Sequence, residues 1–136
     1  MTKLPELNSY YDVGNKDIDF FWKNGFVTLK NVLSKNEISA YRDEIKNVSE
    51  KRNKNREKDF GGAFQQALNI RFDSKGVEMF CLSKRLGKIA ADLMKVNAVR
   101  IFHEQSIFKS PGDTKSYWHQ DQFFWPLDTN LHIGMW

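Results

Sequence analysis

The pattern that most constrains the fold is a helix start at residue 34 followed by a long apolar stripe. Ser34 and Glu37 have the three-residue spacing of a capping box, in which two side chains satisfy backbone amides at a helix N-terminus. The apolar residues that follow recur at intervals of three and four, which places them on one helical face: Ile38, Tyr41, Ile45 and Val48. The sequence therefore predicts an amphipathic helix over about residues 34–50.

Two further helices are predicted, one on each side of this one. Residues 17–24 form a short stretch that ends at Gly25, which suits the left-handed conformation that closes many helices. Another amphipathic helix starts near Ser83, and its buried stripe consists of Leu86, Ile89, Ala90 and Leu93. Met79 and Cys81, just before that helix, are expected in the core.

The second half of the chain changes from helical periodicity to alternation. In residues 99–109, Gln105 shares one face with His103 and with three apolar residues. The expected strands lie at residues 26–32, 99–109, 116–125 and 131–136, the last three separated by turn-forming residues. Because helices precede strands, the expected fold class is α+β, with a helical preface over about residues 15–97 and strands over about 98–136.

Composition narrows the class of protein. The net charge of +4 is small and acidic residues interrupt the basic ones, so a nucleic-acid surface is not expected. Cys81 is the single cysteine, which excludes an internal disulfide and fits a reducing compartment. No apolar run is long enough for a membrane span or a signal peptide, so we expect a soluble, cytoplasmic protein. The sequence does not specify the oligomeric state.

A mixed charge run, SEKRNKNREKDFGG, occupies residues 49–62. Its two glycines allow a phosphate-binding loop or a mobile lid. Because acids interrupt the basic residues, a solvated helix end followed by a linker is the favoured interpretation.

The stretch WHQDQFFWP, residues 118–126, sets an ionisable pair among aromatic residues. In a strand, His119 and Asp121 project from the same face, together with Tyr117 and Phe123. An imidazole nitrogen beside a carboxylate oxygen offers two adjacent positions to a divalent metal, as in the facial triad of non-haem Fe(II) oxygenases. A plain hydrogen-bonded pair is the alternative. A zinc hydrolase fits less well, because the usual three-ligand zinc motifs are missing from the sequence.

The flanking motifs carry a family resemblance. In order along the chain, FFWKNGFVTLKNVLS, VRIFHEQSIFKSPG, YWHQDQFFWPLD and IGMW resemble the phytanoyl-CoA dioxygenase family over about residues 15–136. Members are Fe(II)- and 2-oxoglutarate-dependent oxygenases built on a double-stranded β-helix, a jelly-roll barrel of the cupin kind. The resemblance implies that residues 1–136 form a single domain, the amino-terminal part of such an enzyme, with the helical preface and the first barrel strands.

The resemblance also implies roles for particular residues. His119 and Asp121 match the first two iron ligands, and therefore the catalytic centre. Gln105 and Trp136 fall where the family lines the 2-oxoglutarate pocket, and Asn69 falls near another contact to this co-substrate. The residues alone leave other interpretations open: Gln105 hydrogen-bonded to His103 or to the backbone, and Trp136 as plain core.

Two further groups of the family site are expected outside this sequence. The family uses a third histidine ligand and an arginine whose planar fork binds the distal carboxylate of 2-oxoglutarate. The remaining histidines, His103 and His132, do not stand where the family has its third ligand. The chain is therefore expected to be part of a longer enzyme or a truncated relative.

The expected function is a dioxygenase that hydroxylates a C–H bond of a small organic substrate, with dioxygen and 2-oxoglutarate as partners. A halogenase is disfavoured, because that chemistry replaces the acidic ligand with a small residue and Asp121 is present. The alternative of a different class is a truncated, non-catalytic remnant that acts as an interaction fragment. Phe123, Phe124 and Trp125 are candidate walls of the substrate site or, equally, core residues.

Overall fold

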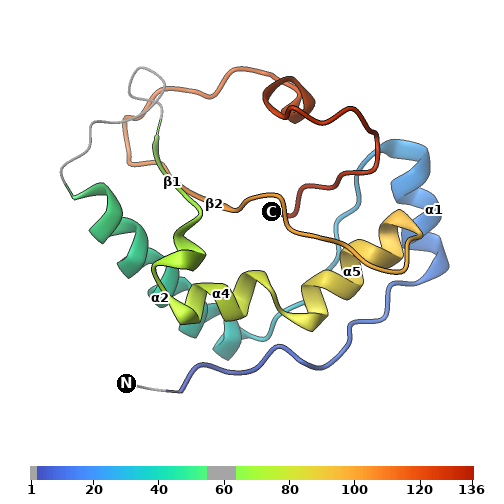
Figure 1. The fold of residues 1–136 in the computed structure, drawn as a ribbon, viewed down its shortest axis with the longest axis horizontal. Helices are drawn as coiled ribbons and strands as arrows, with labels where there is room; N and C mark the ends of the chain where they lie inside the picture. Colours follow the sequence, from blue (N-terminus) through green and yellow to red (C-terminus); the bar gives the residue numbers. More distant parts are fainter. Residues whose placement is uncertain (1–2, 55–63) are drawn as a thin grey trace.

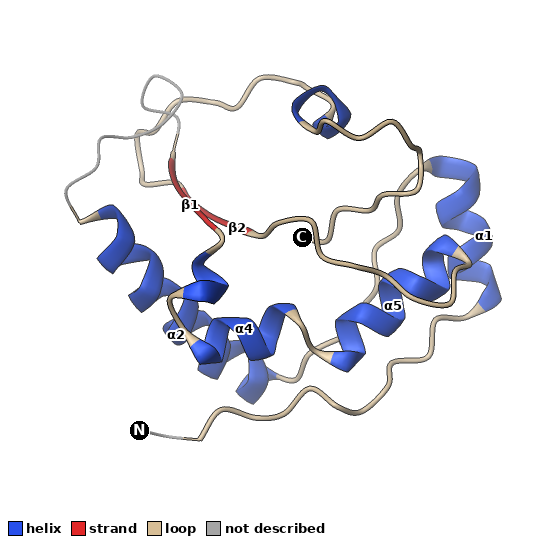
Figure 2. Cartoon of the chain, in the orientation of Figure 1, coloured by secondary structure: helices blue, strands red, loops and turns tan. Residues whose placement is uncertain are grey.

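The computed structural model describes residues 3–54 and 64–136. Its elements, in chain order, are α1 (Asn15–Asn24), α2 (Lys35–Asn53), β1 (Gln65–Leu68), the 3₁₀ turn η1 (Ile70–Phe72), α4 (Lys75–Cys81), α5 (Lys84–Met94), β2 (Gln105–Phe108) and the 3₁₀ turn η2 (Asp121–Phe124). The helices lie along one side and the segment after β2 runs along the other, mostly as loop (Figures 1 and 2). The fold class is α+β, as predicted.

Helix boundaries follow the local signals in the sequence. The capping box is present at the start of α2: the Glu37 amide donates to Ser34 Oγ at 3.2 Å, and the Ser34 amide donates to Glu37 Oε2 at 2.7 Å. Helix α1 ends at Gly25, whose φ of 79° is left-handed and whose amide bonds to the Phe21 carbonyl. Ser83 caps α5 by accepting a bond from the backbone amide of Leu86. The three predicted helices are confirmed.

The apolar residues form two clusters, one for each pair of helices. The first joins α1 to α5 and contains Val13, Ile89 and Leu93, with Ile133 packed against it from the far end of the chain. The second lies between α2, β1 and α4 and is built on Ala67, Ile70 and Val77, with Ile45, Val48 and Cys81 beside it. The predicted stripes of α2 and α5 therefore face the core, except that Ile38 is exposed.

The sheet is an antiparallel pair of short strands. Leu68 of β1 lies opposite Gln105 of β2, and Ala67 lies opposite Ser106. Alternation places Ala67 and Ser106 on the face toward α2, where Ala67 is fully buried and Ser106 Oγ lies 2.7 Å from Ser49 Oγ. The side chains of Leu68 and Gln105 lie on the opposite face, away from the helix.

Three of the four predicted strands are wrong and the fourth is shorter than expected. Residues 26–32, 116–125 and 131–136 are not in strands, and only Gln105–Phe108 of the 99–109 stretch pairs in a sheet. Alternation of apolar and polar residues indicates which side of an extended segment is buried. A strand also needs a neighbouring strand that hydrogen-bonds to its backbone. In residues 26–32, Val27, Leu29 and Val32 pack on the first cluster without pairing to a neighbouring strand, and Asn31 (φ 59°) turns the chain out of the extended region.

Two elements of the structure, β1 and α4, were not predicted from the sequence. The strand β1, QQAL, has too little apolar alternation to be recognised, and α4 was expected only as core residues before α5. Helix α4 packs closely on the chain around it, since a Cβ added at Gly76 would lie 2.5 Å from Leu4 Cδ1. Most of the predicted charged linker, residues 55–62, lies outside the described residues. Within the described part, no helix has the length and apolar character to cross a bilayer.

Candidate metal and co-substrate site

His119 and Asp121 face each other although they do not lie in a strand. Asp121 opens η2, and His119 precedes it in an extended segment. Their side chains meet with His119 Nε2 3.5 Å from Asp121 Oδ1, and both are about half exposed. The Phe124 ring lies edge-on to the imidazole, with centroids 5.7 Å apart. The predicted pairing of the two side chains is present, but a 3₁₀ turn supplies it rather than the period of a strand.

The other ring nitrogen of His119 is held by the backbone. Nδ1 lies 2.8 Å from the carbonyl oxygen of Tyr117. A carbonyl can only accept a hydrogen bond, so Nδ1 carries a proton and the neutral ring has its lone pair on Nε2. This is the arrangement in which metal-ligating histidines are oriented by a second contact. A lone pair on Nε2 facing a carboxylate oxygen is stabilised only by a proton or a cation between them.

The distance between these two atoms suits a shared metal ion. Metal–ligand bonds of about 2.1 Å at right angles place neighbouring ligand atoms about 3.0 Å apart. Nε2 and Oδ1 therefore need to approach by only about half an ångström to share an ion. Among the described residues, no group of three or more histidine, cysteine or acidic side chains is arranged around a common point. The described residues fit iron as two adjacent ligands.

Trp136 reaches the same neighbourhood through the last turn of the chain. A Cβ placed at Gly134 would lie 3.8 Å from Asp121 Oδ2 and 3.9 Å from Trp136 Nε1. The IGMW segment therefore folds back against η2, and Asp121 Oδ2 and Trp136 Nε1 both lie beside Gly134. The Trp136 ring is almost fully exposed, so the interpretation of this residue as plain core is wrong.

Contacts between aromatic rings connect the end of η2 to other segments of the chain. The Trp125 ring lies between two histidines, with its centroid 6.1 Å from that of His103 and 4.8 Å from that of His132. Ile133, next in the chain, packs on the cluster of α1 and α5. Sequence analysis gave His103 and His132 no joint role, because no local pattern brings His103 to Trp125, which is 22 residues away. Their contacts position the turn that carries Asp121.

Asn69 and Gln105 lie together at the end of the β1–β2 pair. The Asn69 amide donates to the Glu104 carbonyl at 2.8 Å, and Asn69 Oδ1 accepts from Arg71 Nη1 at 2.6 Å. Arg71 also forms a largely buried ion pair with Glu104. This ion pair, which sequence analysis missed, fixes the position of Asn69, whose φ of 54° is left-handed.

Gln105 has a different partner from the one expected. Its Oε1 accepts a hydrogen bond of 2.8 Å from Gln66 Nε2 on the neighbouring strand, rather than a bond from His103 or the backbone. The carbonyl end of Gln105 is therefore engaged, which leaves its amino end as a donor on an exposed residue. The structure thus groups His119 with Asp121 and Trp136, and groups Asn69 with Gln105.

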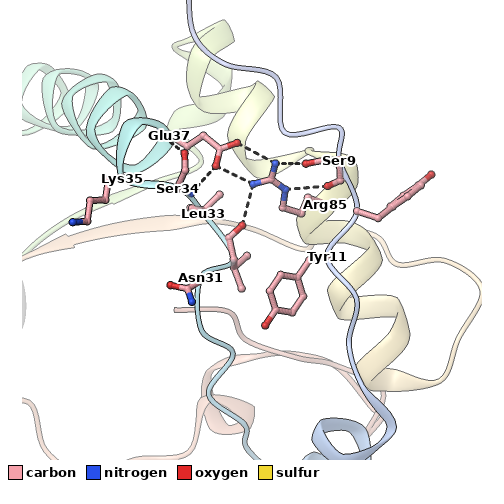
Figure 3. A pocket seen from close by; sticks show the side chains of 10 residues that line it. Ser9, Tyr11, Asn31, Leu33, Ser34, Lys35, Glu37 and Arg85 are labelled. Carbon is pink, nitrogen blue, oxygen red and sulfur yellow. Dashed lines mark hydrogen bonds and ion pairs between the residues drawn. The ribbon is translucent and has the colours of Figure 1, made fainter.

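A separate surface pocket lies near Arg85, away from these residues. It has a volume of about 440 Å³ and lies between the N-terminal segment, the loop before α2 and the start of α5 (Figure 3). The Arg85 side chain at its base is buried, and every one of its N–H groups has a partner in Ser9, Val32 or Glu37. The hydrogen bond from Arg85 is the largest cause that lowers the pKa of Glu37, from 4.5 to about 2. With its donors used internally, Arg85 is a structural residue here.

A family model described as Phytanoyl-CoA dioxygenase (PhyH) matches residues 21–136, which is most of the chain. No curated protein and no solved structure matches it.

Proposed function

The chain belongs to the phytanoyl-CoA dioxygenase family, and from this premise we propose that it is the amino-terminal part of an Fe(II)- and 2-oxoglutarate-dependent dioxygenase. The reaction proposed is hydroxylation of a C–H bond in a small organic substrate. The observation that supports it best is the orientation of His119, with Nδ1 bonded to the Tyr117 carbonyl and Nε2 facing Asp121. With Nδ1 bonded to the Tyr117 carbonyl, Nε2 is the nitrogen available to a metal, and Asp121 Oδ1 lies beside it. A ring protonated on both nitrogens would form a plain ion pair in the same geometry, and metal titration distinguishes the two.

His119 and Asp121 would hold Fe(II) as adjacent ligands. Bound iron supplies the activation of dioxygen, with 2-oxoglutarate as the source of two electrons. The contribution of the chain would be to hold the two ligand atoms side by side. The Tyr117 carbonyl sets the plane of the imidazole, and the turn η2 sets the direction of the Asp121 carboxylate.

Gln105, Asn69 and Trp136 are proposed to bind the co-substrate. The amino end of Gln105 and the indole N–H of Trp136 are donors, and 2-oxoglutarate presents carboxylate and keto oxygens that only accept. Gln66 keeps the Gln105 amide in this orientation, because a donor already occupies its Oε1. Arg71 does the same for Asn69, whose Oδ1 it occupies.

The aromatic residues of η2 are assigned different tasks. Phe124 contacts the His119 ring and is exposed on its other side, so we assign it to the wall of the substrate site, together with the exposed Phe123. Trp125 is half buried between His103 and His132, and we assign it a structural role. A double-stranded β-helix, completed by strands beyond these, is the proposed framework for the whole site.

Calorimetric titration with Mn(II), a redox-stable substitute for Fe(II), tests the proposal on the chain as it is. We expect weak one-to-one binding that falls at least about tenfold in His119→Ala, because a single carboxylate cannot hold the ion in a fixed geometry. Asp128→Asn is the matched control, because Asp128 is an exposed acid of the same segment whereas the acid beside His119 is Asp121. Equal binding by His119→Ala, or no binding by the unmodified chain, would overturn the proposal and favour a non-catalytic remnant.

A further inference from the structure

A pair of serine hydroxyls joins helix α2 to strand β2. Ser49 is 1% exposed, and its Oγ lies 2.7 Å from the carbonyl oxygen of Ile45 and 2.7 Å from Oγ of Ser106. A hydroxyl has one proton to donate, and a carbonyl oxygen can only accept. Ser49 therefore donates to Ile45, and Ser106 donates to Ser49. The contact between helix and strand thus has a fixed direction, with the strand as the donor.

Neither helix formation nor packing requires a hydroxyl at position 49. Alanine has the higher helix propensity and would bury no polar atom. A serine that bonds to the carbonyl four residues back competes with the backbone and slightly destabilises a helix. A buried hydroxyl is also costly unless it is hydrogen-bonded. What Ser49 adds is therefore an acceptor that distinguishes between the side chains that a neighbouring strand can present to it.

The sequence of β2 makes this contact specific to one register. Ser106 lies opposite Ala67, so two small side chains meet on the face toward α2. A shift of the strand by one residue would turn its other face toward the helix, and a shift by two would bring Glu104 or Phe108 there. Neither a carboxylate nor a phenyl ring can donate to Ser49 Oγ. Within residues 104–108, Ser106 is the only small side chain that carries a donor.

We propose that Ser49 is a positioning residue, which selects the register of β2 and thereby the face on which Gln105 lies. In the observed register Gln105 is on the face opposite to Ser106, where its Oε1 accepts the hydrogen bond from Gln66. A shift by one residue would turn Gln105 toward α2 and break that bond. The use of this face for the co-substrate rests on the proposed function, whereas the selection of the register does not.

Solution NMR of the Gln105 side-chain amide tests the proposal on the whole chain, without metal or 2-oxoglutarate. We expect one pair of amide signals in the unmodified chain, with a nuclear Overhauser effect to Leu68, the residue opposite Gln105. Ser49→Ala should add a second pair, of about one tenth of the total intensity, from molecules in a shifted register. Ser39→Ala, at an exposed position of the same helix, is the matched control and should keep one pair.

Two further variants separate the selection of a register from the mere pairing of a buried hydroxyl. Ser49→Ala/Ser106→Ala leaves no hydroxyl unpaired, yet it should keep the second pair of signals, because the contact that favours one register is gone. Ser106→Thr retains the donor and should show one pair. A single pair in Ser49→Ala, or a second pair that disappears in the double variant, would overturn the proposal. Because metal and co-substrate are left out, neither result bears on the proposed function.

Discussion

Arg85 and Glu37 form a two-pronged ion pair across 48 residues of sequence. Nη1 of Arg85 lies 3.0 Å from Oε2 of Glu37, and Nη2 lies 3.0 Å from Oε1. The pair links the start of α5 to the start of α2, and its remaining donors bind Ser9 and the Val32 carbonyl (Figure 3). One guanidinium thus joins four segments of the chain at the edge of the helical side.

Replacing Arg85 with methionine should destabilise the protein by about 3–5 kcal/mol, because it leaves a carboxylate whose side chain is only 15% exposed without its partner. Urea unfolding followed by circular dichroism measures the change. Lys88→Met, on the same helix but in a more exposed ion pair with Asp92, is the control and should change stability by no more than about 1 kcal/mol. Similar losses in the two variants would show that Arg85 is not the link described.

The same pair predicts a pH dependence. The pKa of Glu37 falls from 4.5 in the unfolded chain to about 2 in the fold, chiefly because Arg85 donates hydrogen bonds to it. The stabilisation is therefore complete above about pH 5 and is lost as the pH falls toward 2. Glu37→Gln keeps a side chain that can complete the capping box but removes the charge. The stability difference between the unmodified chain and this variant should shrink on acidification; a constant difference from pH 6 to 3 would contradict this.

Ser34 should act on stability alone. Ser34→Ala removes the acceptor for the Glu37 amide and should cost about 1 kcal/mol of unfolding free energy. Ser39→Ala, at an exposed position inside the same helix, is the control; it should be neutral or slightly stabilising, because alanine has the higher helix propensity. Mn(II) binding should be unchanged in both variants. Weaker metal binding by Ser34→Ala with unchanged unfolding would assign Ser34 a role in the site.

Cys81 should be a poor nucleophile in the folded protein. Its burial against the second cluster is the main cause that raises the thiol pKa from 9.0 to about 11. Since only the thiolate reacts, labelling with a disulfide reagent at pH 8 should be about 100-fold slower than in urea-unfolded chain. Equal rates in the two states would mean that the thiol is not buried as described.

Helices α1, α2 and α5 were predictable because their signals are local. The capping box of Ser34 and Glu37, the closing Gly25 and the stripe of α5 all lie within one or two helical turns of what they determine. The strands were not predictable, because the backbone pairing of a strand depends on a second strand that is distant in sequence. β2 could be located by its alternation, but its partner β1 carries four residues with little pattern, and the alternating residues 26–32 have no strand to pair with.

In the candidate site, too, local contacts were predictable from the sequence and long-range contacts were not. His119 and Asp121 are two residues apart, and their pairing followed from the sequence even though the expected strand is a 3₁₀ turn. The bond from Gln66 to Gln105 joins residues 39 apart, so no local pattern predicts it. Arg85 left one local hint: a cation in the first turn of a helix opposes the helix dipole and needs a compensating acid.

Residue-resolved NMR of the three histidines tests the central claim most directly. Their ring Cε1–H signals can be assigned with single His→Ala variants, and traces of Mn(II) broaden those nearest the ion. We predict that substoichiometric Mn(II) broadens His119 first, with His103 and His132 affected only at higher concentration, and that Asp121→Asn abolishes this order. Broadening of His103 or His132 before His119, or equal broadening of all three, would contradict a metal site at His119 and Asp121.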